Sequence, residues 1–121
     1  PRPLELHALI DESVVRRVVG GDDVYAGQLR HLIEMAQLPN VTLQIVPFSA
    51  GEHPFLGGSA ALLKFRESTH LDVVYLEGLA GDYYEEQPSE VARYRESFAL
   101  LSTKALDGHE TLRTIESLLG A

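Results

Sequence analysis

The first third of the chain changes from an alternating pattern to a helical one. Over residues 4–10, three apolar positions separated by steps of two are Leu4, Leu6 and Ala8. This period predicts a half-buried strand, and residues 11–17 follow as a turn and a short helical piece. From residue 22 to residue 38 the apolar stripe of an amphipathic helix comprises Tyr25, Leu29, Leu32, Ile33 and Ala36. We therefore expect a strand and a long helix, separated by the break at Gly20-Gly21.

The middle of the chain predicts three further strands. Val41, Leu43 and Ile45 alternate with polar neighbours, so residues 41–46 should form a strand that ends at Pro47. Residues 49–58 contain three glycines and a proline, which predicts an irregular loop. Residues 59–65 and 71–76 are the other strand candidates, and residues 66–70 should connect them as a hairpin.

The last third has helical spacing. After Pro88-Ser89, apolar residues recur in alternating steps of three and four, the spacing of a seam: Val91, Tyr94, Phe98, Leu101 and Ala105. Asp107 stands three residues before Glu110, a variant of the capping box, and predicts the start of a final helix. The predicted order is strand, helix, three strands and two helices. It indicates an α+β fold with a single domain over residues 1–121, in which an amphipathic helix and two C-terminal helices cover a small, mainly antiparallel sheet.

The amino-acid composition argues against several classes of function. Ten Lys and Arg residues stand against eighteen Asp and Glu residues, so the formal net charge is −8, and a surface of this sign repels nucleic acid. The chain has no cysteine, which excludes disulfides and thiolate zinc sites. Its apolar runs are far shorter than the roughly twenty residues that span a bilayer, and no signal-peptide pattern opens it. We expect a cytoplasmic protein without membrane attachment, and, because Pro1 is not an initiator, a chain that begins partway along a longer one.

Catalytic and metal-binding signatures are weak. The five histidines are His7, His31, His53, His70 and His109, and no two have the spacing that places both imidazoles on one helical face. We expect no metal, no cofactor and no catalytic residue. An alternative is a small hydrolase or transferase that uses His53 or the acids between residues 72 and 86, since facing carboxylates can divide acid and base roles.

One charged corner favours binding. If residues 12–16 are helical, Glu12 and Arg16 lie one turn apart and can pair, which leaves Arg17 for an anionic group. Charged residues near turns or at the glycine-rich loop are the predicted ligand- or partner-binding residues: Glu12, Arg16, Arg30, His53 and Glu77. A third alternative is homodimerisation through the seam of residues 91–105, although packing of this seam against the chain's own sheet is the favoured explanation, because the sheet must be covered.

Four segments resemble one known family: LHALIDESVVRRVVGG at 6–21, LPNVTLQIVPF at 38–48, DVVYLE at 72–77 and EVARYR at 90–95. They are similar to the domain of unknown function DUF5753, which follows the DNA-binding module in actinobacterial, antitoxin-like transcriptional regulators of the XRE class. The resemblance implies a regulatory domain that senses a small-molecule effector or receives a small partner protein. The helix-turn-helix module of such regulators is not present in these residues, so direct nucleic-acid binding by this chain is not expected.

Overall fold

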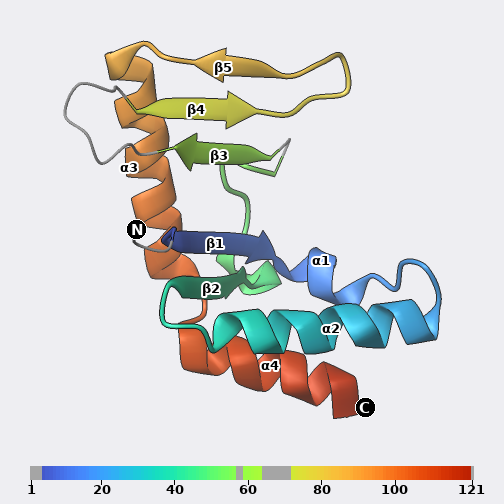
Figure 1. Ribbon diagram of the computed structural model, residues 1–121. Coiled ribbons are helices and arrows are strands. Elements are labelled where there is room, and N and C mark those ends of the chain that lie inside the picture. The colour runs from blue at the N-terminus through green and yellow to red at the C-terminus, as the bar shows by residue number, and fades with distance from the viewer. Residues whose placement is uncertain (1–3, 57–58, 64–71, 121) are drawn as a thin grey trace. The chain divides into compact units, whose positions relative to one another are not determined.

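The computed structural model describes residues 4–56, 59–63 and 72–120 (Figure 1). The predicted hairpin connection at residues 66–70 lies outside them. The contacts group the chain into two compact units, one formed by residues 1–51 with 102–121 and the other by residues 52–101.

The first unit is built around a parallel pair of strands. β1 (Leu6–Asp11) pairs with β2 (Val41–Val46) from Leu6 opposite Val41 to Asp11 opposite Val46. Parallel neighbours need a long crossover connection. Here the connection contains α1 (Glu12–Arg16) and α2 (Asp22–Ala36).

Local chemistry explains where these helices begin. Asp11 precedes α1, and its carboxylate accepts hydrogen bonds from the Ser13 backbone N at 3.1 Å and from Ser13 Oγ at 2.6 Å. These bonds satisfy a donor that the first turn of a helix leaves without an intrahelical partner. Gly21 precedes α2 with φ 90° and ψ 169°, a backbone conformation open essentially to glycine alone. The break predicted at Gly20-Gly21 therefore has a defined role, because it turns the chain into α2.

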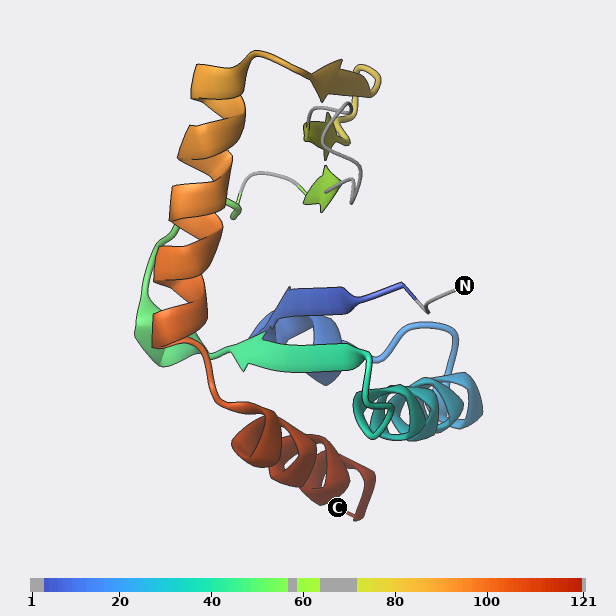
Figure 2. The same cartoon turned by 60° about the vertical axis from the view of Figure 1, so that its left-hand side comes forward.

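The core of the first unit lies between the strand pair and two helices. Figure 2 shows α4 (Gly108–Gly120) and α2 close to β2, and both helices contact that strand and each other. The buried side chains of this core are Val15, Leu29, Leu43, Ile45 and Ile115. Burial of the apolar stripe predicted for residues 22–38, together with that of Ile115 on α4, thus supplies the main stabilisation of this unit.

The segment before α4 completes the hydrogen bonding of β2. Leu106 N donates to the Ile45 carbonyl at 2.9 Å, and Ile45 N donates to Thr111 Oγ1 at 2.9 Å. The Gln44 side-chain amide donates to the carbonyls of Ser102 and Leu106 at 3.2 and 3.0 Å. These bonds satisfy both backbone groups of Ile45 and the side-chain amide of Gln44 with partners outside β1.

The second unit contains an antiparallel sheet with the order β3 (Ala60–Leu63), β4 (Val73–Leu76) and β5 (Tyr83–Glu85). Val74 of the central strand is fully buried, and Tyr75 lies opposite Tyr84 with their ring centroids 5.1 Å apart. α3 (Pro88–Lys104) follows, and its Arg95 forms an ion pair of 2.6 Å with Asp72. The short 3₁₀ turn η1 (Phe48–Ala50) belongs to the first unit.

The structure confirms the α+β class and the small antiparallel sheet. In detail, the strands divide into two sheets, and β1 pairs with β2 in parallel. The sequence does not predict β5, because its three residues, Tyr83–Glu85, are too few for an alternating pattern to be recognised. Two residues of the α3 seam, Val91 and Leu101, are buried within the chain itself. Homodimerisation through this seam stays a prediction. Among the helices described, none has the length and apolar character needed to cross a bilayer.

Candidate binding site at the end of strand β1

A small cavity opens beside the carboxyl end of β1. Its volume is about 150 Å³. The lining comes from the end of β1, from α1 and the turn after it, and from α2, and comprises Ile10, Val14, Arg17, Val19, Tyr25, Gln28, Leu29 and Leu32. Ligands of α/β proteins commonly bind outside the carboxyl ends of parallel strands, where the chain leaves the sheet. This cavity occupies the corresponding position next to the β1–β2 pair.

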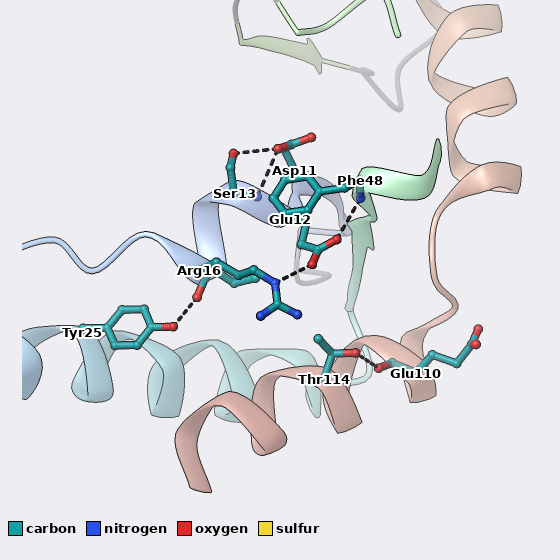
Figure 3. Close-up of polar contacts among 9 residues, drawn as sticks. Asp11, Glu12, Ser13, Arg16, Tyr25, Phe48, Glu110 and Thr114 are labelled. Carbon is teal, nitrogen blue, oxygen red and sulfur yellow. Dashed lines mark hydrogen bonds and ion pairs between the residues drawn. The ribbon is translucent and has the colours of Figure 1, made fainter. Parts of the chain in front are cut away.

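Glu12 fixes the geometry of the α1 corner (Figure 3). Its Oε1 accepts a hydrogen bond from Phe48 N at 2.8 Å, and its Oε2 pairs with Arg16 Nε at 2.5 Å. The backbone donor of Phe48, followed by the Arg16 guanidinium, holds the pKa of Glu12 below its usual value. The Glu12 side chain is only 16% exposed, and its hydrogen bond to Phe48 N connects α1 to the turn after β2. The carboxylate therefore has a structural role.

The two arginines at this corner have different roles. Arg16 pairs with Glu12 across one helical turn, as the spacing predicted. Arg17 follows the last residue of α1, where its backbone N donates to the Ser13 carbonyl at 3.0 Å, and it is one of the residues that line the cavity. In the described part of the chain, no carboxylate forms an ion pair with Arg17. Arg17 is therefore the one cationic residue in an otherwise mainly apolar lining.

Tyr25 connects the two helices that line the cavity. Its hydroxyl donates a hydrogen bond to the backbone carbonyl of Val15, one residue before Arg16 (Figure 3). Val15 itself belongs to the buried core. The bond ties α2 to α1, so the cavity lies between elements that are anchored to the core of the first unit.

The other predicted site residues do not join this corner. Arg30 is an exposed residue of α2 and is not part of the cavity lining. His53 and Glu77 belong to the second unit. There the Phe55 backbone N donates to His53 Nδ1 at 3.2 Å, and Glu77 N donates to the Ser59 carbonyl at 3.3 Å. Of the five predicted residues, the structure thus brings Glu12 and Arg16 into contact.

The acids between residues 72 and 86 have separate partners. Asp72 pairs with Arg95, and Asp82 accepts a hydrogen bond from the Tyr75 hydroxyl at 2.8 Å. Glu85 accepts hydrogen bonds from the backbone N of Glu86 and Gln87 at 3.1 and 3.4 Å, just before α3 begins. These contacts assign the three carboxylates to local structure.

Sequence reasoning identified Arg17 as a cation for an anionic group but missed the apolar lining beside it. Val14 and Val19 are exposed, at 60% and 66%, and an exposed valine gives no signal of a cavity by itself. Among the residues that the structure describes, no group of three or more His, Cys, Asp or Glu side chains is placed to hold a metal ion.

Comparison with known proteins yields one family. The family described as Domain of unknown function (DUF5753) matches residues 1–117, nearly the whole sequence. Neither a curated protein nor a solved structure matches the chain.

Proposed function

This chain belongs to the DUF5753 family, a domain of unknown function, and we propose that it is the regulatory domain of a cytoplasmic XRE-type transcriptional regulator. In this proposal, an effector or a small partner protein binds to the chain and alters DNA binding by a helix-turn-helix module outside it. The domain acts by binding and not by catalysis. The acidic net charge of −8 supports a division of labour in which DNA contacts lie elsewhere in the regulator.

The cavity beside β1 is the observation that carries the proposal. Its lining is mainly apolar and includes one cationic residue, Arg17. Ligand-binding pockets usually have this composition, a few polar groups among apolar side chains. Its walls belong to α1 and α2, which are linked by the Tyr25 hydroxyl and the Val15 carbonyl. An occupant that contacts both helices would therefore favour one arrangement of the α1–α2 connection over others.

Such a preference is what regulation requires. A bound molecule shifts an equilibrium between two states only to the extent that it binds one state more tightly than the other. The connection between α1 and α2, residues 17–21, contains two glycines with positive φ and exposed valines. It is the part of the site whose conformation an occupant can change at least cost.

Chromatin immunoprecipitation of the tagged natural protein from its host tests the proposal. We expect enrichment of discrete DNA sites, and a change of at least about twofold in their occupancy when Val14→Phe fills the cavity mouth, since the variant alters the balance between the two states. Leu100→Phe is the control, because Leu100 on α3 is equally exposed at 60% and does not line the cavity. Absence of DNA enrichment over an untagged strain would contradict the assignment to a DNA-binding regulator.

A further inference from the structure

We infer that the cavity beside β1 binds a compact apolar carboxylate, with the apolar group inside and the carboxylate on Arg17. This inference deepens the proposed function, on which it rests, by naming the chemical class of the effector. Four observations lead to it: the cavity volume, the composition of its lining, the position of the cationic residue Arg17, and the fact that the neighbouring polar groups already have partners.

The volume sets the size of the apolar group. The cavity volume of about 150 Å³ is comparable to that of apolar protein cavities that accommodate a molecule the size of benzene. Pockets for drug-sized ligands are larger, roughly 300–1,000 Å³. The cavity therefore fits one aromatic ring or one branched alkyl group, and it is too small for a nucleotide or an extended cofactor.

The walls select an apolar group. Six of the lining residues present carbon: Ile10, Val14, Val19, Tyr25, Leu29 and Leu32. The one polar atom of Tyr25, its hydroxyl, already donates to the Val15 carbonyl. A sugar or another polyhydroxylated ligand would lose water without gaining enough hydrogen bonds, whereas an aryl or branched alkyl group would be transferred from water to a carbon surface.

The charge selects an anion. Besides Tyr25, the lining residues with polar side chains are Arg17 and Gln28. Arg16, the neighbouring cation, is paired with Glu12, so Arg17 is the arginine that remains for a ligand. A guanidinium binds a carboxylate through two parallel hydrogen bonds, and it disfavours an ammonium group at the same place. Because the net charge of −8 opposes the approach of anions at long range, the attraction between Arg17 and a carboxylate acts at short range.

Three probes of one size separate these contributions: benzoate, benzyl alcohol and benzylammonium. Their binding to the 121-residue chain is measured by chemical-shift titration of the backbone amides. We expect saturable binding of benzoate with a Kd on the order of 1 mM, at the residues that line the cavity. Benzyl alcohol should bind about tenfold more weakly, because it lacks the charge-assisted pair, and benzylammonium more weakly still.

Two pairs of variants locate the site. Arg17→Gln should reduce benzoate affinity about tenfold, to that of benzyl alcohol, while Arg113→Gln on the exposed face of α4 should leave it unchanged. Val14→Phe should abolish binding of benzoate and of benzyl alcohol, and Leu100→Phe should not. Arg17 and Arg113 are both exposed, so their substitution leaves the core intact, and amide spectra of each variant report its folding directly.

Equal affinity for benzoate and benzyl alcohol, or unchanged benzoate binding by Arg17→Gln, would overturn the inference, as would no saturable binding up to about 20 mM, well above the expected Kd. The outcome of the DNA-occupancy experiment is independent of the outcome of the benzoate titration. If the natural protein occupies DNA but the chain does not bind benzoate, the effector class is wrong and the proposed function stands. If benzoate binds but no DNA is occupied, the regulator assignment fails.

Discussion

The buried hydroxyl of Thr111 accepts a hydrogen bond from the backbone N of Ile45 at 2.9 Å and so joins α4 to β2 across 66 residues of sequence. Thr111 is completely inaccessible to solvent, as is the Ile45 side chain. Ile45 also accepts from Leu106 N at 2.9 Å. The C-terminal helix is therefore attached to the strand pair by directional bonds as well as by the apolar contacts of Ile115.

Thr111→Val should lower the free energy of unfolding by about 2 kcal/mol, because the isosteric side chain leaves a buried N–H without its acceptor. Thr111→Ser keeps the hydroxyl and loses one methyl group, so its cost should be smaller, about 1 kcal/mol. Urea denaturation followed by circular dichroism measures both. A Thr111→Val protein as stable as the wild type would show that this hydrogen bond contributes nothing.

Glu12 should make the free energy of unfolding depend on pH in the acidic range. Its pKa in the folded chain lies below the usual 4.5, first because of the Phe48 backbone donor and then because of Arg16. The stabilisation that Glu12 provides is therefore fully present above about pH 4.5 and is lost as the pH falls through the folded pKa.

Glu12→Gln tests this dependence. At pH 7 the variant should be less stable than the wild type by about 1 kcal/mol, since the Phe48 donor keeps an acceptor while the charge-assisted bonds are lost. The difference should shrink as the pH is lowered below 4.5. Glu34→Gln, on the exposed face of α2, is the control and should show no such trend. A constant difference between pH 3 and pH 7 would contradict the account.

Local signals in the sequence predicted local structure well. The capping box forms as predicted: Glu110 N donates to Asp107 Oδ1 at 2.7 Å, and Asp107 N donates to Glu110 Oε1 at 3.2 Å. The pair of Glu12 and Arg16 also forms, and β2 has the predicted bounds. Each of these depends on side chains a few residues apart, so the spacing alone contains the information.

Long-range structure was less accessible. Alternation over residues 4–10 indicates which side chains share a face, but it does not indicate the direction of the neighbouring strand, so the parallel pairing with β2 was not predicted. β5 has only Tyr83, Tyr84 and Glu85, too short a run for a period of two to be seen. The cavity brings Ile10 together with Leu32, and only tertiary packing places these positions side by side.

Tyr75 should titrate abnormally. Its hydrogen bond to Asp82, with smaller contributions from burial and from the charges of Asp82 and Glu77, raises the pKa of Tyr75 to about 12. The raised pKa means that the bond stabilises the folded chain fully below pH 10 and is lost as the pH rises through the folded pKa. Carbon-13 NMR of the tyrosine rings should therefore find one tyrosine that ionises about two units above an ordinary one.

Asp82→Asn should lower the pKa of Tyr75 markedly, because it removes the carboxylate that disfavours the phenolate. Glu77→Gln should lower it less, since Glu77 acts only through charge. If Asp82→Asn leaves the titration unchanged while Glu77→Gln shifts it, the hydrogen bond is not the main cause.

The same substitution at two glycines of the α2 region should have opposite effects. Gly21, which precedes the helix, has φ 90° and ψ 169°, so Gly21→Ala should cost about 1–3 kcal/mol even though no atom lies within 4 Å of the added methyl. Gly27 is exposed within α2, has equally open space around an added methyl, and does not have a positive φ. Gly27→Ala should therefore raise stability by about 0.5–1 kcal/mol, because alanine restricts the unfolded chain and favours the helix. Thermal unfolding of the two variants compares them directly, and a neutral Gly21→Ala would mean that the chain enters α2 with a different backbone conformation.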